Sequence, residues 1–160
     1  MGEITFSETA LPMILGVRTK ILRPGRPIDD ARFPGDNIHG TIHFAAFEGR
    51  FVIGCVTLVP SELDGMKAFQ LRGMAVDDES QGSGIGRGLL SFSEETLKKK
   101  QLESFHDCSC EIILWCNARL SAVGFYQKFG WITISEIFEI EKVGPHRRMV
   151  RKICGLRHFV

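Results

Sequence analysis

The sequence predicts an α/β fold in which helices flank a mixed, mostly antiparallel sheet. Strand-like segments rich in β-branched and aromatic residues follow one another between residues 41 and 76. A continuously apolar run, Cys110–Asn117, is typical of a strand buried on both faces, as parallel strands are. Segments with helical spacing stand before, between and after these strands, which favours layers of helix and sheet.

Length and composition fit one globular domain spanning residues 1–160. Hydrophobic residues make up 44% of the chain and charged residues 24%, and the formal net charge is only +1. This balance gives no support for binding nucleic acid or a membrane surface through bulk charge. No apolar run approaches the ~20 residues of a membrane span and no basic leader precedes the first apolar patch, so a cytoplasmic location is expected.

Five cysteines, an odd and scattered set, argue against a disulfide framework. Cys108 and Cys110 stand too close for the usual zinc-pair spacing, and no second pair follows at a suitable distance. We expect buried, reduced thiols and no metal site.

The first part of the chain predicts a short strand, a helix and a long loop. The strand covers residues 3–6, and Ser7 is placed to cap the following helix. The loop Arg23–Asn37 holds three of the six prolines and is expected to border a site. Helical spacing directs one apolar face toward a core: Leu11, Ile14, Leu15 and Ile21.

Three strands are predicted next. Thr41–Phe47 and Phe51–Val59 form a hairpin around the turn Glu48–Arg50. Pro60–Gly65 is expected to turn the chain again, and Lys67–Val76 forms the third strand.

Helices and strands alternate in the remainder. A long amphipathic helix is predicted over Gly84–Leu102, before the apolar strand described above. A second helix covers Leu120–Phe129 and ends at Gly130. Two last strands, Trp131–Glu141 and Arg148–Cys154, are joined by the segment KVGPHR.

A glycine-rich stretch, MAVDDESQGSGIGRGLL, connects the third strand to the long helix. Its glycines fall at alternate positions: Gly82, Gly84, Gly86 and Gly88. Such a loop permits positive φ, lets a ligand approach the backbone closely, and presents N–H groups beside a helix N-terminus, so a phosphate is the natural guest. The alternative is a turn made only for tight packing between strand and helix.

Two common phosphate motifs do not fit this stretch. At the Walker spacing from Gly82 stands Arg87 and no Gly-Lys pair follows, and the dinucleotide pattern G-x-G-x-x-G closes from neither Gly82 nor Gly84. The pattern Q-x-x-G-x-G does fit, over Gln81–Gly86.

This pattern resembles the pyrophosphate-binding motif of the GNAT N-acetyltransferase superfamily. A second segment, NARLSAVGFYQKFGW over Asn117–Trp131, resembles the later part of that superfamily, where an Asn closes a strand and a Phe-Tyr helix follows. Together the two matches cover about Leu71–Trp131. The resemblance implies a GNAT-like sheet splayed at the cofactor site and acetyl transfer from acetyl-CoA to a primary amine of a small molecule or peptide, by direct attack in a ternary complex.

The resemblance also implies which residues bind coenzyme A. The backbone of Met74, Ala75 and Val76 would pair with the pantetheine arm, and a backbone N–H there would polarise the thioester carbonyl. Asn117 would contact the pantetheine, or alternatively cap the next helix. The pyrophosphate would be held by one continuous set: Gln81, Gly82, Ser83, Gly84, Ile85, Gly86 and Arg87.

Tyr126, the only tyrosine, falls on the family position that faces the thioester sulfur. A phenol of pKa ~10 can protonate a thiolate whose own acid lies near ~8.5, so it is predicted to be the general acid. The alternative is a buried aromatic residue. His146 is the first choice for the general base, ahead of His39, His43 and Glu62.

Arg72, Asp36 and His43 are predicted to bind the acceptor. Two other functions stay open: a coenzyme A binding or sensing module without turnover, and an interaction domain in which the glycines only pack. Edge strands near the C-terminus make a homodimer possible. Nucleic acid and membrane partners are not expected.

Overall fold

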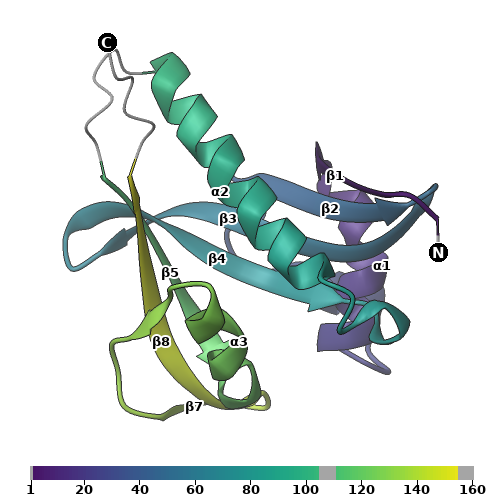
Figure 1. Cartoon of the computed structure of the whole chain (residues 1–160). Helices are drawn as coiled ribbons and strands as arrows, with labels where there is room; N and C mark the ends of the chain where they lie inside the picture. The colour runs from purple at the N-terminus through teal and green to yellow at the C-terminus, as the bar shows by residue number, and fades with distance from the viewer. Residues whose placement is uncertain (1, 105–110, 155–160) are drawn as a thin grey trace.

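The computed structural model describes residues 2–104 and 111–154. Figure 1 shows an open, twisted sheet with helices packed against it. The strands are β1 (Ile4–Thr9), β2 (Ile42–Glu48), β3 (Phe51–Leu63), β4 (Met66–Val76), β5 (Glu111–Arg119), β6 (Ile132–Thr133), β7 (Phe138–Ile140) and β8 (Gly144–Cys154). The α-helices are α1 (Leu11–Leu22), α2 (Ile85–Ser104) and α3 (Val123–Lys128), and the 3₁₀ turns are η1 (Ile28–Ala31), η2 (Asp78–Ser80) and η3 (Leu120–Ala122).

Within the described ranges the strands form one sheet in the order β1-β2-β3-β4-β5-β8-β6, with β7 paired to β8. The pairings there are antiparallel except for β4–β5, which is parallel. The mixed, mostly antiparallel sheet flanked by helices confirms the predicted fold class.

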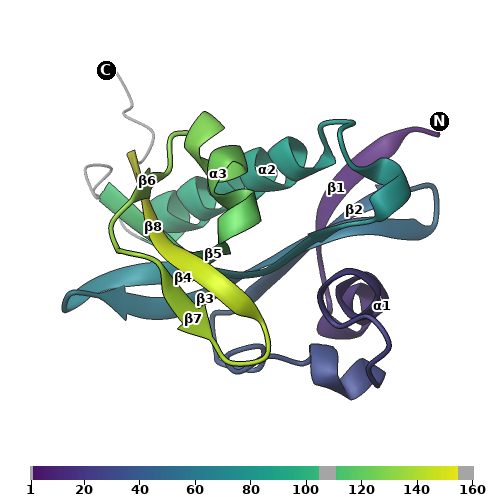
Figure 2. The same ribbon diagram turned by 90° about the horizontal axis from the view of Figure 1, so that it is seen from below.

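Helices cover both faces of the sheet: α2 and α3 lie on one face, and α1 and η1 lie on the other (Figure 2). Side chains alternate along each strand, which explains how one strand serves both layers. In β2, Phe44 and Ala46 belong to the core beneath α2, whereas Ala45 between them packs with α1.

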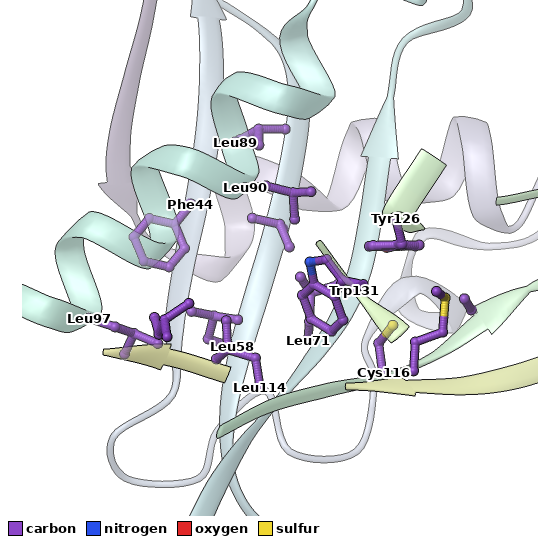
Figure 3. Close-up of a cluster of buried hydrophobic side chains, with 14 of the residues drawn as sticks. Phe44, Leu58, Leu71, Leu89, Leu90, Leu97, Leu114, Cys116, Tyr126 and Trp131 are labelled. Atoms are coloured by element: carbon purple, nitrogen blue, oxygen red, sulfur yellow. The ribbon is translucent and has the colours of Figure 1, made fainter. Parts of the chain in front are cut away.

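The larger core lies between α2, α3 and the sheet (Figure 3). Leu89, Leu90 and Leu97 project from α2 and are almost completely buried. Trp131 closes this core beside α3, and its ring contacts the ring of Tyr126 edge-on with centroids 5.3 Å apart. The predicted amphipathic helix is therefore confirmed, and it begins within the glycine stretch, at Ile85.

The predicted cap of the first helix is wrong. Ser7 lies inside β1, opposite Ala45, because β1 extends to Thr9 as an edge strand beside β2. The residue before α1 is Ala10, which makes no side-chain cap, and Pro12 occupies the first turn, where its missing N–H costs nothing.

The predicted turn at Pro60–Gly65 is also wrong in extent. β3 runs through Pro60 to Leu63, and the tight turn consists of Asp64 and Gly65, both at positive φ. Pro60 is tolerated because β2 does not reach it: the first residue of β2, Ile42, pairs with Leu58. No strand on that side therefore requires an N–H from residue 60.

The C-terminal strands also have bounds that differ from the predicted ones. The segment predicted as one strand, Trp131–Glu141, contains two short strands separated by a bend. β8 begins earlier than expected, so His146 lies in a strand opposite Arg119 and Phe138 rather than in a turn.

Cys55 and Cys116 are buried free thiols, as predicted, whereas Cys154 is exposed. Cys108 and Cys110 lie outside the described residues, so the expectation about that pair has no structural counterpart. None of the helices in the described part of the chain is long and apolar enough to cross a membrane.

Candidate active site

The sheet opens between β4 and β5. These parallel strands pair only at Phe69–Leu114 and Gln70–Trp115, although β4 continues to Val76 and β5 to Arg119. Beyond these two pairs the strands diverge, and each keeps backbone polar groups directed toward the gap. Such groups require a partner, so the gap suits an extended ligand.

A bulge in β4 lies at the edge of this gap. The register with β3 passes from Cys55–Ala75 to Thr57–Arg72, which leaves Gly73 and Met74 opposite a single residue. Gly73 adopts φ 58°, and a Cβ there would come within 2.7 Å of the Arg18 side chain. The bulge therefore requires glycine, and it sets the direction of the Met74 backbone.

A pocket with a volume of about 240 Å³ occupies the gap. Its wall contains five residues that the sequence predicted as functional: Arg72, Met74, Asn117, Tyr126 and His146. These residues come from β4, β5, α3 and β8. The structure thus brings predicted cofactor, acid, base and acceptor residues to one cavity.

Tyr126 lies at the inner wall, 6% exposed. Its hydroxyl contacts the Met74 sulfur at 3.5 Å, a weak acceptor, so the proton is available to a ligand. Burial, and then the neighbouring Cys116, raise the pKa of Tyr126 well above its usual value near 10. The phenol therefore keeps its proton throughout the neutral pH range.

His146 is 4% exposed and borders the same pocket. Its Nδ1 lies 2.7 Å from the Gly144 carbonyl oxygen. A carbonyl can only accept a hydrogen bond, so Nδ1 carries a proton, and in the neutral ring the lone pair resides on Nε2. The ring is thus held in the tautomer that allows Nε2 to accept a proton.

The glycine loop lies apart from this pocket, at the end of β4. Gly82 and Gly84 adopt φ 76° and 85°, and a Cβ at either would meet nothing within 4 Å. Both are exposed, and α2 begins at the next residue, Ile85. Gln81 braces the loop, because its side-chain amide donates to the Val76 carbonyl and to Asp78. This exposed backbone at a long helix's N-terminus suits an anion.

The other two glycines of the stretch serve packing. A Cβ at Gly86 would lie 3.0 Å from the Phe125 ring, and one at Gly88 would lie 2.1 Å from Phe6. Packing therefore accounts for Gly86 and Gly88, whereas no packing contact requires glycine at Gly82 or Gly84.

Arg87, Ser83 and Asn117, all cofactor candidates, take different positions. Arg87 is exposed on the first turn of α2, and Ser83 donates to the Ser80 carbonyl within the loop. Asn117 lies inside β5, and its side-chain oxygen accepts a hydrogen bond from Arg148 Nε at 3.4 Å. The residue at the N-cap of the next helical turn, η3, is Arg119. Asn117 therefore does not cap a helix.

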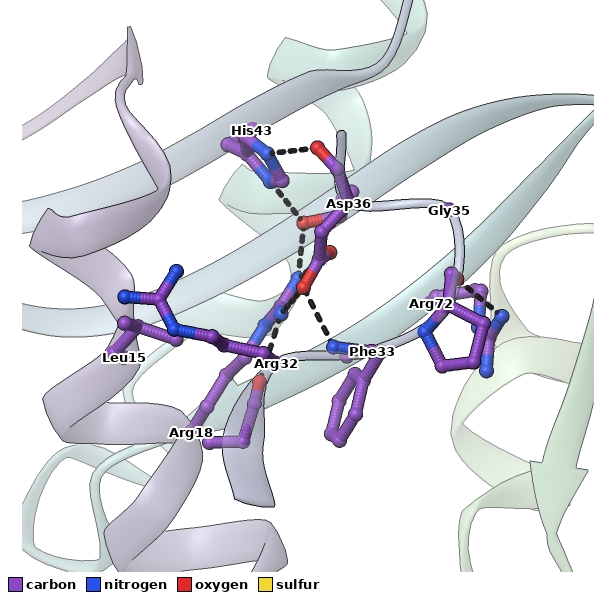
Figure 4. A network of polar contacts seen from close by, with 12 residues as sticks. Leu15, Arg18, Arg32, Phe33, Gly35, Asp36, His43 and Arg72 are labelled. Atoms are coloured by element: carbon purple, nitrogen blue, oxygen red, sulfur yellow. Dashed lines mark hydrogen bonds and ion pairs between the residues drawn. The ribbon is translucent and has the colours of Figure 1, made fainter. Parts of the chain in front are cut away.

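Asp36 and His43 lie outside the pocket wall, in a buried network with Arg18 and Thr57 (Figure 4). Arg18 donates to both Asp36 carboxylate oxygens, at 2.7 and 3.0 Å, and to the Thr57 hydroxyl at 2.6 Å. His43 lies 2.7 Å from that hydroxyl and 3.1 Å from the Asp36 carbonyl oxygen. The polar atoms of Asp36 and His43 are thus occupied in joining the long loop to α1, β2 and β3.

The alternative bases are placed less favourably than His146. His39 and Glu62 are exposed and are not part of the pocket wall. Burial lowers the pKa of His43, which keeps it neutral, but both of its ring nitrogens have partners.

Two charged residues of the pocket wall were not predicted from the sequence: Arg23, at the end of α1, and Arg119, at the end of β5. Arg23 lies in the proline-rich loop that was expected to border a site, but no motif singled it out. Arg119 lies within the second matched segment, yet its side chain reaches the Leu22 carbonyl, a contact across 97 residues.

The chain resembles known acetyltransferases. The acetyltransferase (GNAT) domain family matches residues 39–133. The uncharacterized N-acetyltransferase YitI of Bacillus subtilis (strain 168) is 28% identical over 140 residues, which cover 86% of this chain and 88% of that protein.

Solved structures share the fold. An acyl-CoA N-acyltransferase from Pseudomonas aeruginosa superposes with a TM-score of 0.70 at 15% identity, covering 93% of this chain and 99% of that one. An aminoglycoside 6′-N-acetyltransferase complexed with coenzyme A gives a TM-score of 0.65 at 15% identity, covering 92% and 96%.

Proposed function

Because the chain belongs to the GNAT acetyltransferase family, we propose that it transfers the acetyl group of acetyl-CoA to a primary amine of a small molecule or peptide. The observation that carries this proposal is the pocket at the β4–β5 gap, where Tyr126, His146 and the Met74 backbone meet. The coenzyme A bound to the aminoglycoside acetyltransferase of the same fold supports coenzyme A as the carrier.

The glycine loop fits the pyrophosphate. Gly82 and Gly84 leave the backbone uncovered, and the first N–H groups of α2, at Ile85, Gly86 and Arg87, have no acceptor within the helix. Gln81 and Ser83 hold the loop through hydrogen bonds to neighbouring residues. An anion of two phosphates would find both donors and positive potential there.

The pantetheine arm fits the gap between the diverging strands. Its amide groups would pair with the backbone around Met74, Ala75 and Val76, as an added strand does. Asn117 on β5 faces the same pocket and offers an amide side chain to the arm. An N–H of the bulge at Met74 would polarise the thioester carbonyl.

The amine attacks the acetyl carbon directly, so a carbon–nitrogen bond forms and the carbon–sulfur bond breaks while both substrates are bound. His146 Nε2 accepts the first proton, which the ammonium group loses before attack, and Tyr126 donates its proton to the departing thiolate. The nitrogen loses its second proton after the carbon–nitrogen bond has formed, and this proton restores the phenol. Apolar surroundings disfavour both the phenolate and the thiolate, so burial of Tyr126 does not forbid this transfer.

Arg72 belongs to the acceptor side. Its guanidinium donates to the Pro34 carbonyl at 2.6 Å, which ties the long loop to the pocket wall. Asp36 and His43 support the acceptor site indirectly, by fixing that loop through their buried network.

Calorimetry and thiol release test this function. Wild-type protein should bind coenzyme A and release thiol from acetyl-CoA when an amine is supplied. Gly84→Asp should weaken coenzyme A binding at least about 10-fold, because it adds a carboxylate where the phosphates bind. Gly65→Asp is the matched control, since Gly65 has positive φ and open space in the β3–β4 turn, at the opposite end of β4 from the glycine loop.

Absence of coenzyme A binding would contradict the proposal. Tight binding without acetylation of any amine would instead identify a coenzyme A binding module on the same fold. We also propose a cytoplasmic location. A homodimer could form through the C-terminal edge of the sheet, where Ile132 and Ile137 are exposed, and sedimentation of the purified protein tests for it.

A further inference from the structure

The pocket wall carries a concentration of positive charge. Within the described part of the chain, the wall contains three arginines and no aspartate or glutamate. They come from three elements: Arg23 ends α1, Arg72 lies in β4, and Arg119 ends β5. The whole chain has a net charge of only +1, so this cluster is a local feature.

These arginines do not form ion pairs within residues 2–104 and 111–154. Their hydrogen bonds go to backbone carbonyls: Arg23 and Arg119 to Leu22, and Arg72 to Pro34. Other arginines of the same loop are neutralised, since Arg26 pairs with Asp30 and Arg32 with Asp29. A second pocket beside the loop shares Arg23 and Arg119 with the first. Of its carboxylates, Asp29 and Asp30 are paired with Arg32 and Arg26, and Glu141 forms no ion pair within the described residues.

Burial lowers the pKa of both Arg23 and Arg72. The charge of Arg119 lowers the pKa of Arg23 further, which shows that the two guanidinium groups repel each other. Arg23 also lies over the Phe33 ring, 4.9 Å from its centre, so its orientation is fixed by stacking. Asp30 and Asp36 are near enough to favour the charged forms of Arg23 and Arg72, but neither forms an ion pair with them. Partly buried guanidinium groups that lack an ion pair are well suited to bind an anionic ligand.

We propose that the acceptor amine carries a carboxylate, which Arg72, Arg119 and Arg23 bind at the pocket on the α1 side of the sheet. The substrate class is thus an amino acid or a short peptide with a free carboxylate. This inference depends on the proposed acetyl transfer. The loop that bears Arg23 lies on the α1 face (Figure 2), whereas the glycine loop leads into α2 on the other face, so the two anion sites serve different molecules.

A paired substrate panel tests the proposal: dipeptides as free acids and as C-terminal amides, each with acetyl-CoA, followed by thiol release. The free acids should show a kcat/KM at least about 10-fold higher than their amides, because the guanidinium groups lose their ionic partner in the amide. Arg72→Gln and, separately, Arg119→Gln should bring the acid-to-amide ratio toward one. Arg50→Gln, on the exposed β2–β3 turn, is the matched control and should keep the ratio.

Coenzyme A binding is measured on each variant by calorimetry. It should stay unchanged in Arg72→Gln and Arg119→Gln; weaker binding would mean that the arginines hold cofactor phosphates and would overturn the inference. Equal rates on acids and amides, or reaction with neither set by a protein that binds coenzyme A, would also overturn it. Failure to bind coenzyme A at all would instead contradict the acetyltransferase function.

Discussion

In the proposed acetyl transfer, Tyr126 takes part most directly, as the proton donor. Replacing it with Phe removes the proton donor and keeps the ring, so the contacts with Phe125 and Trp131 remain. We expect kcat to fall on the order of 100-fold, the usual contribution of a general acid, with coenzyme A affinity unchanged. Because the pKa of Tyr126 lies well above 10, the loss should be the same from pH 6 to 9.

Steady-state kinetics and calorimetry check this expectation. A Tyr126→Phe variant that turns over at the wild-type rate across that range would leave the hydroxyl without a catalytic role.

His43 makes stability depend on pH. Burial lowers the pKa of His43 below its ordinary value of 6.5, so the unfolded chain takes up this proton more readily than the folded one. The stability that neutral His43 contributes is therefore fully present above about pH 6.5. It is lost as the pH falls below the pKa of His43 in the unfolded chain toward its lower pKa in the folded protein. Urea unfolding between pH 5 and 8 should show a steeper loss at low pH for the wild type than for His43→Gln.

His39→Gln provides the control, since His39 is exposed and its removal should leave that slope unchanged. Identical slopes in all three proteins would show that His43 titrates as freely in the folded state as in the unfolded chain.

Among the predicted site residues, three that a local motif carries line the pocket, and so do Arg72 and His146, whereas Asp36 and His43 lie in a buried network outside its wall. Met74, Asn117 and Tyr126 stand at fixed distances from two motifs, and all three line the pocket. Asp36 and His43 are typical functional residue types, but a buried arginine 18 residues before Asp36 engages that carboxylate. Only the folded chain reveals that pairing, because the sequence does not show which cation reaches which anion.

At the scale of elements, the long helix α2 depends on a glycine that faces a strand. A Cβ on Gly88 would lie 2.1 Å from the ring of Phe6 in β1, and that ring stacks on Phe92 with centroids 6.3 Å apart. Gly88→Ala should therefore lower the free energy of unfolding by about 1–3 kcal/mol despite the better helix propensity of alanine.

Gly16→Ala is the matched substitution. Gly16 is exposed in α1, and a Cβ there meets nothing within 4 Å, so this variant should gain up to about 1 kcal/mol. Thermal and urea unfolding of both variants compare the two effects. If Gly88→Ala were as stable as Gly16→Ala, Phe6 would not restrict the approach of α2.

The elements themselves were predicted best where a periodic pattern was long. The long helix α2 and the strands that follow Thr41 begin within a few residues of their expected positions. Errors arose at prolines and turns: Pro60 lies in β3 because its neighbour β2 has already ended, and β8 includes Pro145 because it pairs with the short β7. Strand ends are set by partners, which a single sequence does not identify.

At the scale of the whole molecule, the network around Arg18 connects the long loop to the sheet. Arg18 is 0% exposed and its guanidinium bonds to Asp36, Thr57 and the Ala31 carbonyl. Arg18→Met would leave the Asp36 carboxylate buried without its cation, which should cost about 3–5 kcal/mol of unfolding free energy. The double variant Arg18→Met, Asp36→Leu should recover part of that loss.

Arg26→Met is the control for this measurement, because the Arg26–Asp30 pair is exposed and should contribute less than about 1 kcal/mol. Denaturant unfolding of the wild type, the two single variants and the double variant compares the stability that the buried and the exposed ion pair contribute. Equal losses in Arg18→Met and Arg26→Met would mean that solvent reaches the Asp36 site freely.

The chain holds a single tyrosine, and the fold places it in the wall of the pocket. Ultraviolet difference absorption of phenol ionisation in this protein therefore arises from one group, without labelling or subtraction of other tyrosines. An alkaline titration of the intact molecule is in effect an optical probe of this pocket, and any ligand that covers the hydroxyl should displace its midpoint.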